Sequence, residues 1–277
     1  MKKKSTMFLM MLGAAMLTTS CLSEQQDLAP KNEASQKGKI VLNLSADASF
    51  DEQTRALSEA NYRNTSVYTV RLLNLSNNNV MMECLGSELS DNLPKELELG
   101  SYEILAYYGT ESDASRDNFR VEGKTDFTIK AKDELNITVA CEPTCGKLSV
   151  NFADEMATYY DDYSVTYSGT AALGGKTITW AKDDTEPWYV ALGTSAETIN
   201  YTLNLKVKDD YAIEENGVKK KTGTVTGSFQ LQRNKGHKLS ITPHYTEMEN
   251  GFMKLTITID ESTNDKPITI EVPVTWI

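Results

Sequence analysis

From Gly38 onward, apolar and polar residues alternate in short stretches along the chain. The stretches are rich in Val, Ile, Thr and Tyr, and they are broken at intervals of about ten residues by Gly, Asn, Asp or Pro. Successive side chains of a strand point to opposite sides, so this alternation is typical of strands with one buried face. The pattern predicts strands throughout both halves, among them KIVLNLSA, NVMMECL, YEILAYYG, LNITVACE, CGKLSVNF, INYTLNLKVK and HKLSITPHY.

Helical periodicity is confined to two short segments, SEANY at 58–62 and ADEMATYY at 153–160, each sufficient for a single turn. Many short strands without a long amphipathic helix predict an all-β protein of the sandwich type. The roughly 240 residues after the N-terminal region exceed one sandwich and suit two of about a hundred. Pro143 and Gly146 interrupt two strands, so we expect tandem β-sandwiches at 38–142 and 143–277, with the strands at the join nearly continuous.

The N-terminal residues have the features of an export signal. Three lysines at positions 2–4 precede an apolar run at 7–17, and small residues follow up to Cys21. The run is too short to cross a bilayer of roughly 30 Å as a helix, so residues 1–20 are predicted to be a signal peptide. The residues before Cys21 resemble the lipobox of bacterial lipoproteins, although Thr18 stands where leucine is usual and Leu17 lies one place earlier. That resemblance implies an acylated, palmitate-bearing Cys21; a plain cleaved signal is the alternative.

The next segment, residues 21–37, is polar, contains Pro30 and lacks aromatic residues, which predicts a flexible tether. Ser23 and Glu24 resemble the acidic signal that directs such lipoproteins to the cell exterior, so we expect a lipid-anchored, surface-exposed protein of the outer membrane. A position that faces the periplasm is the alternative, because Gln25 and Gln26 depart from that signal. The net charge of −11 becomes −14 once the three lysines of the signal are removed. So acidic a chain does not hold nucleic acid electrostatically.

Groups that could support catalysis or metal binding are few. Cys84, Cys141 and Cys145 remain after Cys21; an odd number allows at most one disulfide, and its pairing is open. No histidine accompanies the C-x-x-x-C spacing, so a zinc site would have too few ligands. His237 and His244 lie seven apart on one predicted strand and therefore face opposite sides. No catalytic or nucleotide-binding motif occurs, and we predict a protein that is not an enzyme and holds no metal or cofactor.

Three aromatic residues, Trp180, Trp188 and Tyr189, lie close together around a polar loop. In carbohydrate-binding sandwiches such rings stack on sugars, which makes these residues ligand-binding candidates. Trp180 ends one predicted strand and Trp188 begins the next, so packing in the core is the alternative that the pattern favours.

The C-terminal segment PITIEVPVTWI continues the alternation to the end of the chain. One face of the predicted strand carries five apolar side chains, those of Ile268, Ile270, Val272, Val274 and Trp276. Such a strand can close its own sheet or insert into a groove of another molecule. Pro273 removes one backbone donor, which suits an edge strand.

The loop FDEQTRALSEA at 50–60 lies directly after the strand predicted at 39–46. Its single basic residue, Arg55, precedes Ala56. The loop is either an ordinary surface connection or a cleavage site between these two residues.

A family resemblance adds to this reading. LELGSYEILAYYG at 97–109 resembles the LPxGxY-type hairpin of a Bacteroidetes lipoprotein domain family whose function is unassigned. FTIKAKDELNITVACEPTCGKLSVNF at 127–152, NKGHKLSI at 234–241 and MKLTITID at 253–260 resemble further segments of that family. The family is similar to the fimbrillin-like proteins, which have two β-sandwich domains of transthyretin-like topology.

The resemblance implies a route of assembly. In fimbrillin-like proteins an arginine-directed protease cuts the exported precursor after its first strand, and a strand from the next subunit fills the groove that opens. Here this implies cleavage between Arg55 and Ala56, with residues 267–277 as the donor strand and other fimbrial subunits as partners. The alternative from the sequence is an uncut outer-membrane lipoprotein that binds a glycan or a host protein.

Overall fold

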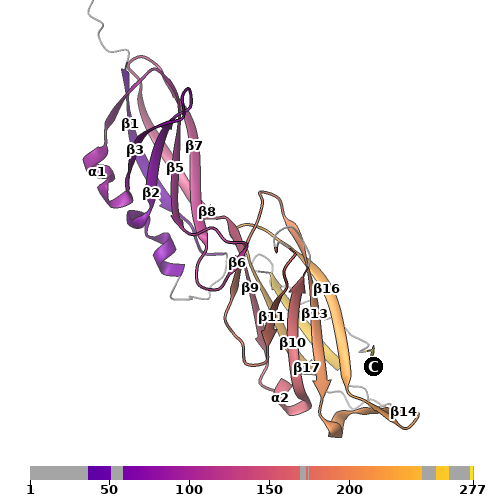
Figure 1. Cartoon of the computed structure of the whole chain (residues 1–277). Helices are drawn as coiled ribbons and strands as arrows, with labels where there is room; N and C mark the ends of the chain where they lie inside the picture. Colours follow the sequence, from indigo (N-terminus) through magenta and orange to yellow (C-terminus); the bar gives the residue numbers. More distant parts are fainter. Residues whose placement is uncertain are drawn as a thin grey trace, which may run out of the picture. The chain divides into compact units, whose positions relative to one another are not determined.

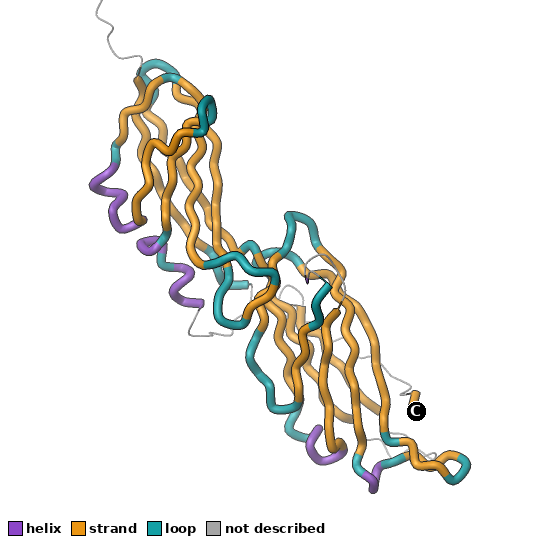
Figure 2. Tube along the Cα trace, viewed as in Figure 1, coloured by secondary structure: helices purple, strands orange, loops and turns teal. Residues whose placement is uncertain are grey.

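The structure of the chain is a computed structural model that describes residues 37–50, 59–168, 173, 175–244, 254–261 and 275–276. Residues 35–277 belong to one compact unit. Strands dominate this unit, and its helices are short turns between them (Figures 1 and 2). The predicted all-β class is confirmed.

Strands of the first half form a sheet in the order β3-β2-β5-β7-β8-β1-β4. The bounds are β1 (Lys37–Ala46), β2 (Thr69–Asn74), β3 (Asn79–Leu85), β4 (Lys95–Glu98), β5 (Gly100–Gly109), β7 (Arg120–Ile129) and β8 (Glu134–Pro143). β7 and β8 pair only near one end, at Val121–Pro143 and the adjacent pair, so β8-β1-β4 forms a second layer over β3-β2-β5-β7. Ile40 and Ile104, one from each layer, are buried in the same core.

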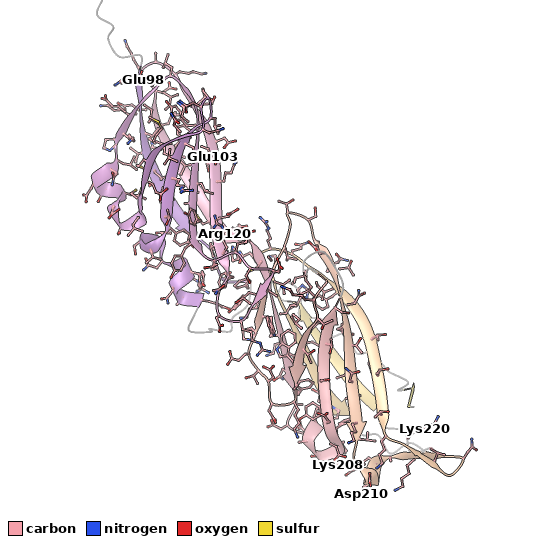
Figure 3. All side chains as sticks on the ribbon, in the orientation of Figure 1. Glu98, Glu103, Arg120, Lys208, Asp210 and Lys220 are labelled. Carbon is pink, nitrogen blue, oxygen red and sulfur yellow. The ribbon has the colours of Figure 1, made fainter. Side chains whose placement is uncertain are left out.

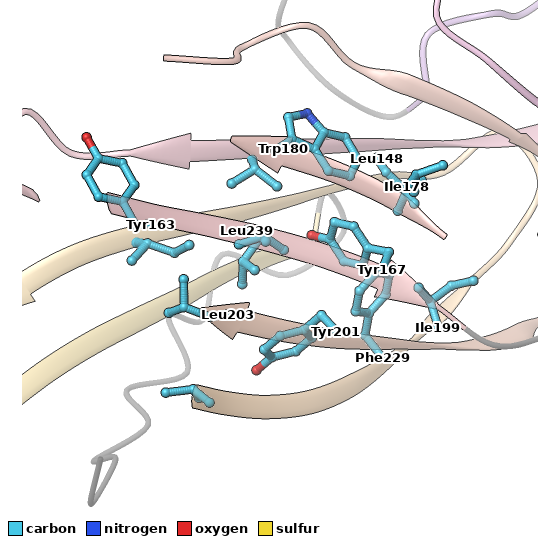
Figure 4. Packing of buried hydrophobic residues seen from close by; sticks show 14 of the residues in the cluster. Leu148, Tyr163, Tyr167, Ile178, Trp180, Ile199, Tyr201, Leu203, Phe229 and Leu239 are labelled. Carbon is cyan, nitrogen blue, oxygen red and sulfur yellow. The ribbon is translucent and has the colours of Figure 1, made fainter. Parts of the chain in front are cut away.

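Strands of the second half form two sheets, β11-β10-β13-β16-β19 and β18-β17-β9-β12-β6. The bounds are β9 (Cys145–Phe152), β10 (Tyr160–Ser168), β11 (Ile178–Ala181), β12 (Trp188–Ala191), β13 (Glu197–Val207), β16 (Thr222–Leu231), β17 (Gly236–His244), β18 (Lys254–Glu261) and β19 (Thr275–Trp276). Leu148 and Leu239 from one sheet pack with Tyr167 and Trp180 from the other (Figure 4). The Tyr167 ring lies edge-on to that of Trp180, with centroids 5.0 Å apart.

Three short strands lie outside the segments that the alternation predicts. β6 (Ala114–Ser115) lies between β5 and β7 in sequence, yet it pairs with β12 in a sheet of the second half. β14 (Ile213–Glu215) and β15 (Val218–Lys220) form a separate hairpin. Its turn residues Asn216 and Gly217 have φ of 52° and 76°, the two positive values that a type I′ turn requires.

Several predicted elements are confirmed. β3 has the bounds of NVMMECL, and the two helical segments are the single turns η1 (Glu59–Arg63) and α2 (Met156–Tyr159). Only Thr144 separates β8 from β9, as expected for strands that run nearly continuously.

The remaining short helices are η2 (Thr65–Val67), η3 (Gly86–Glu88), α1 (Leu89–Asn92) and η5 (Asp209–Tyr211). The buried residues form two hydrophobic clusters, one of which joins residues 40–141 to Cys145 and Tyr189. The division into domains at 142/143 stays a prediction.

Candidate functional site

The first strand, β1, lies inside its sheet and not at an edge. It pairs in parallel with β8 along most of its length and antiparallel with β4 near its start. Lys37 Nζ and Glu98 Oε1 form an exposed ion pair between β1 and β4, 3.3 Å apart (Glu98 is labelled in Figure 3). Removal of β1 would therefore expose unpaired backbone donors and acceptors on two strands, β8 and β4.

The inner face of β1 is part of the core. Ile40 is fully buried, Leu42 is buried and Leu44 is half-buried. Gly38 is buried too, and a Cβ at this position would lie 2.8 Å from Cγ2 of Ile129. β1 thus occupies the space between β8 and β4, which we call its slot, and its inner face packs on the apolar residues of the core. At position 38, near the start of the strand, only glycine fits.

Phe50 marks the end of the described residues that follow β1, and it is firmly held. Its ring is fully buried and contacts the rings of Phe119 and Tyr189, at centroid distances of 5.2 and 5.6 Å. Its backbone N–H donates to Asn234 Oδ1 at 3.2 Å, and its carbonyl accepts from the Gly236 N–H at 2.8 Å. The φ of Phe50 is 53°, a left-handed conformation that costs a bulky residue about 1–3 kcal/mol. These contacts hold Phe50 in a conformation that it would not adopt in a free chain.

Glu59 opens the next described segment and is also buried. Its carboxylate lies 3.0 Å from Lys147 Nζ, and it accepts a hydrogen bond of 2.8 Å from the Tyr189 hydroxyl. The Glu59 and Lys147 side chains are only 2% and 4% exposed, so both charges lie away from water. Two buried charges of opposite sign are tolerated because each compensates the desolvation of the other.

The helical turn after Glu59 is packed as well. The Tyr62 ring stacks on Phe119 with centroids 3.8 Å apart, and its hydroxyl accepts from the Phe119 N–H at 3.3 Å. The Tyr68 hydroxyl donates to the Tyr62 carbonyl at 2.5 Å. Phe50 and Tyr62, which lie on either side of 51–58, thus belong to the same hydrophobic cluster. Arg55 and Ala56, the predicted cleavage residues, lie outside the described residues, as does Cys21 with the predicted signal peptide and tether.

The described part of the chain contains no helix that is both long and apolar enough to cross a membrane. Of the five apolar residues of the predicted donor strand, only Trp276 falls in a described element, β19, which pairs antiparallel with β16 at the edge of the described part of that sheet. The other four residues, Ile268, Ile270, Val272 and Val274, lie outside the described residues.

The three aromatic candidates do not form an exposed platform. Trp180 is fully buried, with its indole N–H donating to the Glu186 carbonyl at 2.8 Å, and Tyr189 is 3% exposed. Trp188 is half-buried, and the Arg116 guanidinium covers its ring 4.9 Å from the centroid. Core packing and a cation thus cover much of these rings, and the binding of a sugar by these residues stays a prediction.

The cysteines Cys84, Cys141 and Cys145 are all free, so the one disulfide that the sequence allowed is not formed. Burial raises the pKa of the Cys141 thiol to about 12 and also raises that of Cys145, which keeps both thiols protonated and unreactive. His237 and His244 both lie on β17, as predicted. Among the described residues, no group of three or more His, Cys, Asp or Glu side chains has the arrangement of a metal site.

A pocket of about 240 Å³ in the second half is lined by Asp154, Tyr163, Asp183 and Asp184, among others. Arg116 donates two hydrogen bonds to Asp184, at 2.7 and 2.6 Å, and so holds the pKa of that carboxyl below its usual range. The pocket therefore contains carboxylates, one of which is already neutralised by an ion pair.

A comparison with protein-family models identifies the family. The model described as "Domain of unknown function (DUF4493)" matches residues 36–274, which is most of the chain. The chain belongs to this family. The resemblance to a family of unassigned function is thus confirmed. A comparison with curated proteins found no match.

Solved structures with a similar fold include a fimbrial assembly protein from Parabacteroides distasonis ATCC 8503, at 10% identity and a TM-score of 0.43, covering 84% of this chain and 98% of that one. A putative cell adhesion protein from Bacteroides eggerthii DSM 20697 has 8% identity and a TM-score of 0.40, covering 81% and 95%. The fimbrial anchor protein Mfa2 from Porphyromonas gingivalis has 9% identity and a TM-score of 0.34, covering 81% and 98%. At these scores the similarity does not bear on the function of this chain.

Proposed function

We propose that this chain is a lipid-anchored, surface-exposed structural or adhesive subunit whose first strand is exchanged for a strand of another subunit. Acylated Cys21 holds the precursor at the outer membrane, and cleavage after Arg55 separates β1 from the rest of the chain. The observation that carries the proposal is the position of β1: it is the first strand among the described residues, it precedes Arg55, and it fills a slot between β8 and β4.

The physical chemistry of the slot supports exchange. With β1 gone, two strands present unpaired backbone groups beside the apolar floor that Ile40 and Leu42 now cover. An unpaired sheet edge next to an apolar groove favours the addition of a strand, because the incoming backbone provides hydrogen bonds and its alternate side chains fill the groove. The strand that replaces β1 should therefore be an extended segment in which apolar and polar residues alternate.

The C-terminal segment of another subunit has that character. Every second residue from Ile268 to Trp276 is apolar, and the residues between them are Thr269, Glu271, Pro273 and Thr275. β19 lies at the edge of its own sheet, where a strand has one pairing neighbour and so loses fewer backbone hydrogen bonds on leaving. We therefore propose this segment as the donor.

The test begins with the N-terminus of the protein recovered from cells. An acylated Cys21 supports the anchored precursor, and an N-terminal Ala56 supports cleavage. Purified precursor is then treated with an arginine-specific protease, which should produce a chain that begins at Ala56 and ladders that resist mild denaturant. The Arg55→Lys variant keeps the charge but should be neither cut at 55 nor assembled. Arg63→Lys, which changes an exposed arginine of η1, is the matched control and should behave like the unchanged protein.

Cleavage after Arg55 that yields only monomers would reject assembly by strand exchange. If the folded chain resists cleavage at this position and cells contain only the form with acylated Cys21, the protein is an uncut surface lipoprotein. A glycan array and a screen against host surface proteins then become the relevant measurements.

A further inference from the structure

Both ends of the segment between Phe50 and Glu59 are fixed to the same sheet of the second half. The Phe50 carbonyl accepts from Gly236 at the start of β17, and the Glu59 carboxylate pairs with Lys147 on β9. Tyr189 on β12 contacts both ends, since its ring packs on Phe50 and its hydroxyl donates to Glu59. β17, β9 and β12 are neighbours in one sheet. These contacts join residues on either side of the predicted cut to a common support.

None of these contacts depends on the chain being continuous between residues 50 and 59. Phe50 is bonded through both its backbone groups and its ring, and Glu59 through its carboxylate. A cut between them removes the covalent link but leaves every one of these interactions in place. What the cut changes is the effective concentration of β1 at its slot, because a released strand would no longer be held nearby by its own chain.

We propose that Phe50, with its partners Asn234, Gly236 and Tyr189, is a retention clasp that keeps β1 in its slot after the chain has been cut. The strand then leaves only when Phe50 withdraws from between Phe119 and Tyr189. The inference rests on the proposed cleavage and adds a second step to it. A cut subunit remains closed, with its β8 and β4 edges covered, until a donor strand displaces β1. While β1 covers them, the edges of β8 and β4 cannot pair with strands of unrelated chains.

The position of Phe50 explains why it can act as a clasp. Its ring is fully buried, so withdrawal exposes a large apolar side chain and breaks two backbone hydrogen bonds. Its left-handed φ of 53° is relieved on release, which makes the clasp reversible once a competing strand is present. Glu59 stays with the larger fragment and keeps the other end of the cut in place.

The experiment uses the full mature chain with residues 52–57 replaced by the recognition sequence of a site-specific protease. This allows the cut to be made whether or not Arg55 is a natural site. After complete cutting, size-exclusion chromatography and native mass spectrometry follow the departure of the fragment that carries β1. In the otherwise unchanged protein, at a dilution too great for a second subunit to supply a donor strand, the fragment should remain bound for hours. Phe50→Ala should speed its dissociation about a hundredfold, as expected from the loss of a large buried side chain.

Two further variants test the mechanism. Asn234→Gly removes the acceptor for the Phe50 N–H but accommodates the φ of 53° at this position, and it should speed dissociation about tenfold. Phe152→Ala is the matched control, because Phe152 lies at the opposite end of β9 and packs on Tyr163; it should leave the dissociation rate unchanged. If Phe50→Ala does not fold, the unchanged protein and Asn234→Gly still decide the question.

Two results overturn the clasp: a fragment that leaves the unchanged protein as soon as the chain is cut, or one whose release is equally slow when the Phe50 contacts are removed. These outcomes are independent of the proposed function. Resistance of Arg55 to proteolysis rejects the natural cut but leaves the clasp intact if the engineered cut still retains β1.

Discussion

Substitution of Lys147 by methionine should destabilise the protein by about 3 kcal/mol at neutral pH, because it leaves a buried carboxylate without its cation. Glu59 is 2% exposed, and of its two partners only the Tyr189 hydroxyl would remain. Breaking a buried ion pair on one side costs about 3–5 kcal/mol, and the surviving hydrogen bond argues for the lower end. For a unit of this size each kcal/mol lowers the Tm by about 2–4 °C, so the Tm should fall by about 6–12 °C.

Urea unfolding followed by tryptophan fluorescence measures the effect, since Trp180 is fully buried in the native state. The matched control is Lys176→Met. Lys176 pairs with Asp113 on the surface, where the two side chains are 68% and 64% exposed, and its loss should cost less than about 0.5 kcal/mol. The double variant Lys147→Met, Glu59→Gln removes both charges while Gln still accepts from Tyr189, so it should recover at least half of the lost stability.

The reasoning is refuted if Lys147→Met shifts the unfolding midpoint no more than Lys176→Met does. It is equally refuted if the double variant loses as much free energy of unfolding as Lys147→Met and Glu59→Gln lose together. Either result would mean that the charges at Glu59 and Lys147 are well solvated or compensated in the native protein.

Two other substitutions test local features. Asp184→Asn should cost about 1 kcal/mol at pH 7 in urea unfolding. Because Arg116 lowers the folded-state pKa of Asp184, this contribution is fully present above about pH 4 and is lost as the pH falls through the folded-state pKa, so the difference between variant and parent should shrink as the pH is lowered below about 4. Gly109→Ala should cost more than about 2 kcal/mol, because φ is 83° and a Cβ would lie 1.9 Å from the Phe119 carbonyl oxygen. Gly217→Ala, at φ 76° in open space, should cost only about 1 kcal/mol, and equal losses in thermal unfolding would contradict the steric argument.

The strands could be predicted because their signal is local. The alternation in NVMMECL is sufficient to place β3, and that in KIVLNLSA places β1 to within two residues of its start. The Asn216-Gly217 dipeptide is a strong hairpin signal in the sequence. The strands beside it are only three residues long, too short to show alternation.

The residues around the candidate site could not be predicted in the same way. Phe50 and Glu59 stand in a polar stretch, and nothing next to them in sequence indicates burial. Their partners Lys147, Tyr189 and Asn234 lie about 90 to 180 residues away along the chain. The burial of the Glu59 and Lys147 charges depends on which strands pack together in the folded protein. The alternation of apolar and polar residues along a strand contains no information about that packing.

By itself the sequence determined the class of the protein, the strands and their buried faces, since these depend on residues two positions apart. Only the tertiary structure decided that β1 lies between β8 and β4, that the aromatic residues Trp180 and Tyr189 are buried, and that Phe50 and Glu59 share one support. The physical reason is that strand neighbours are selected by long-range packing and backbone pairing. Many orders of the same strands satisfy the same alternation, and the packing of both cores selects one of them.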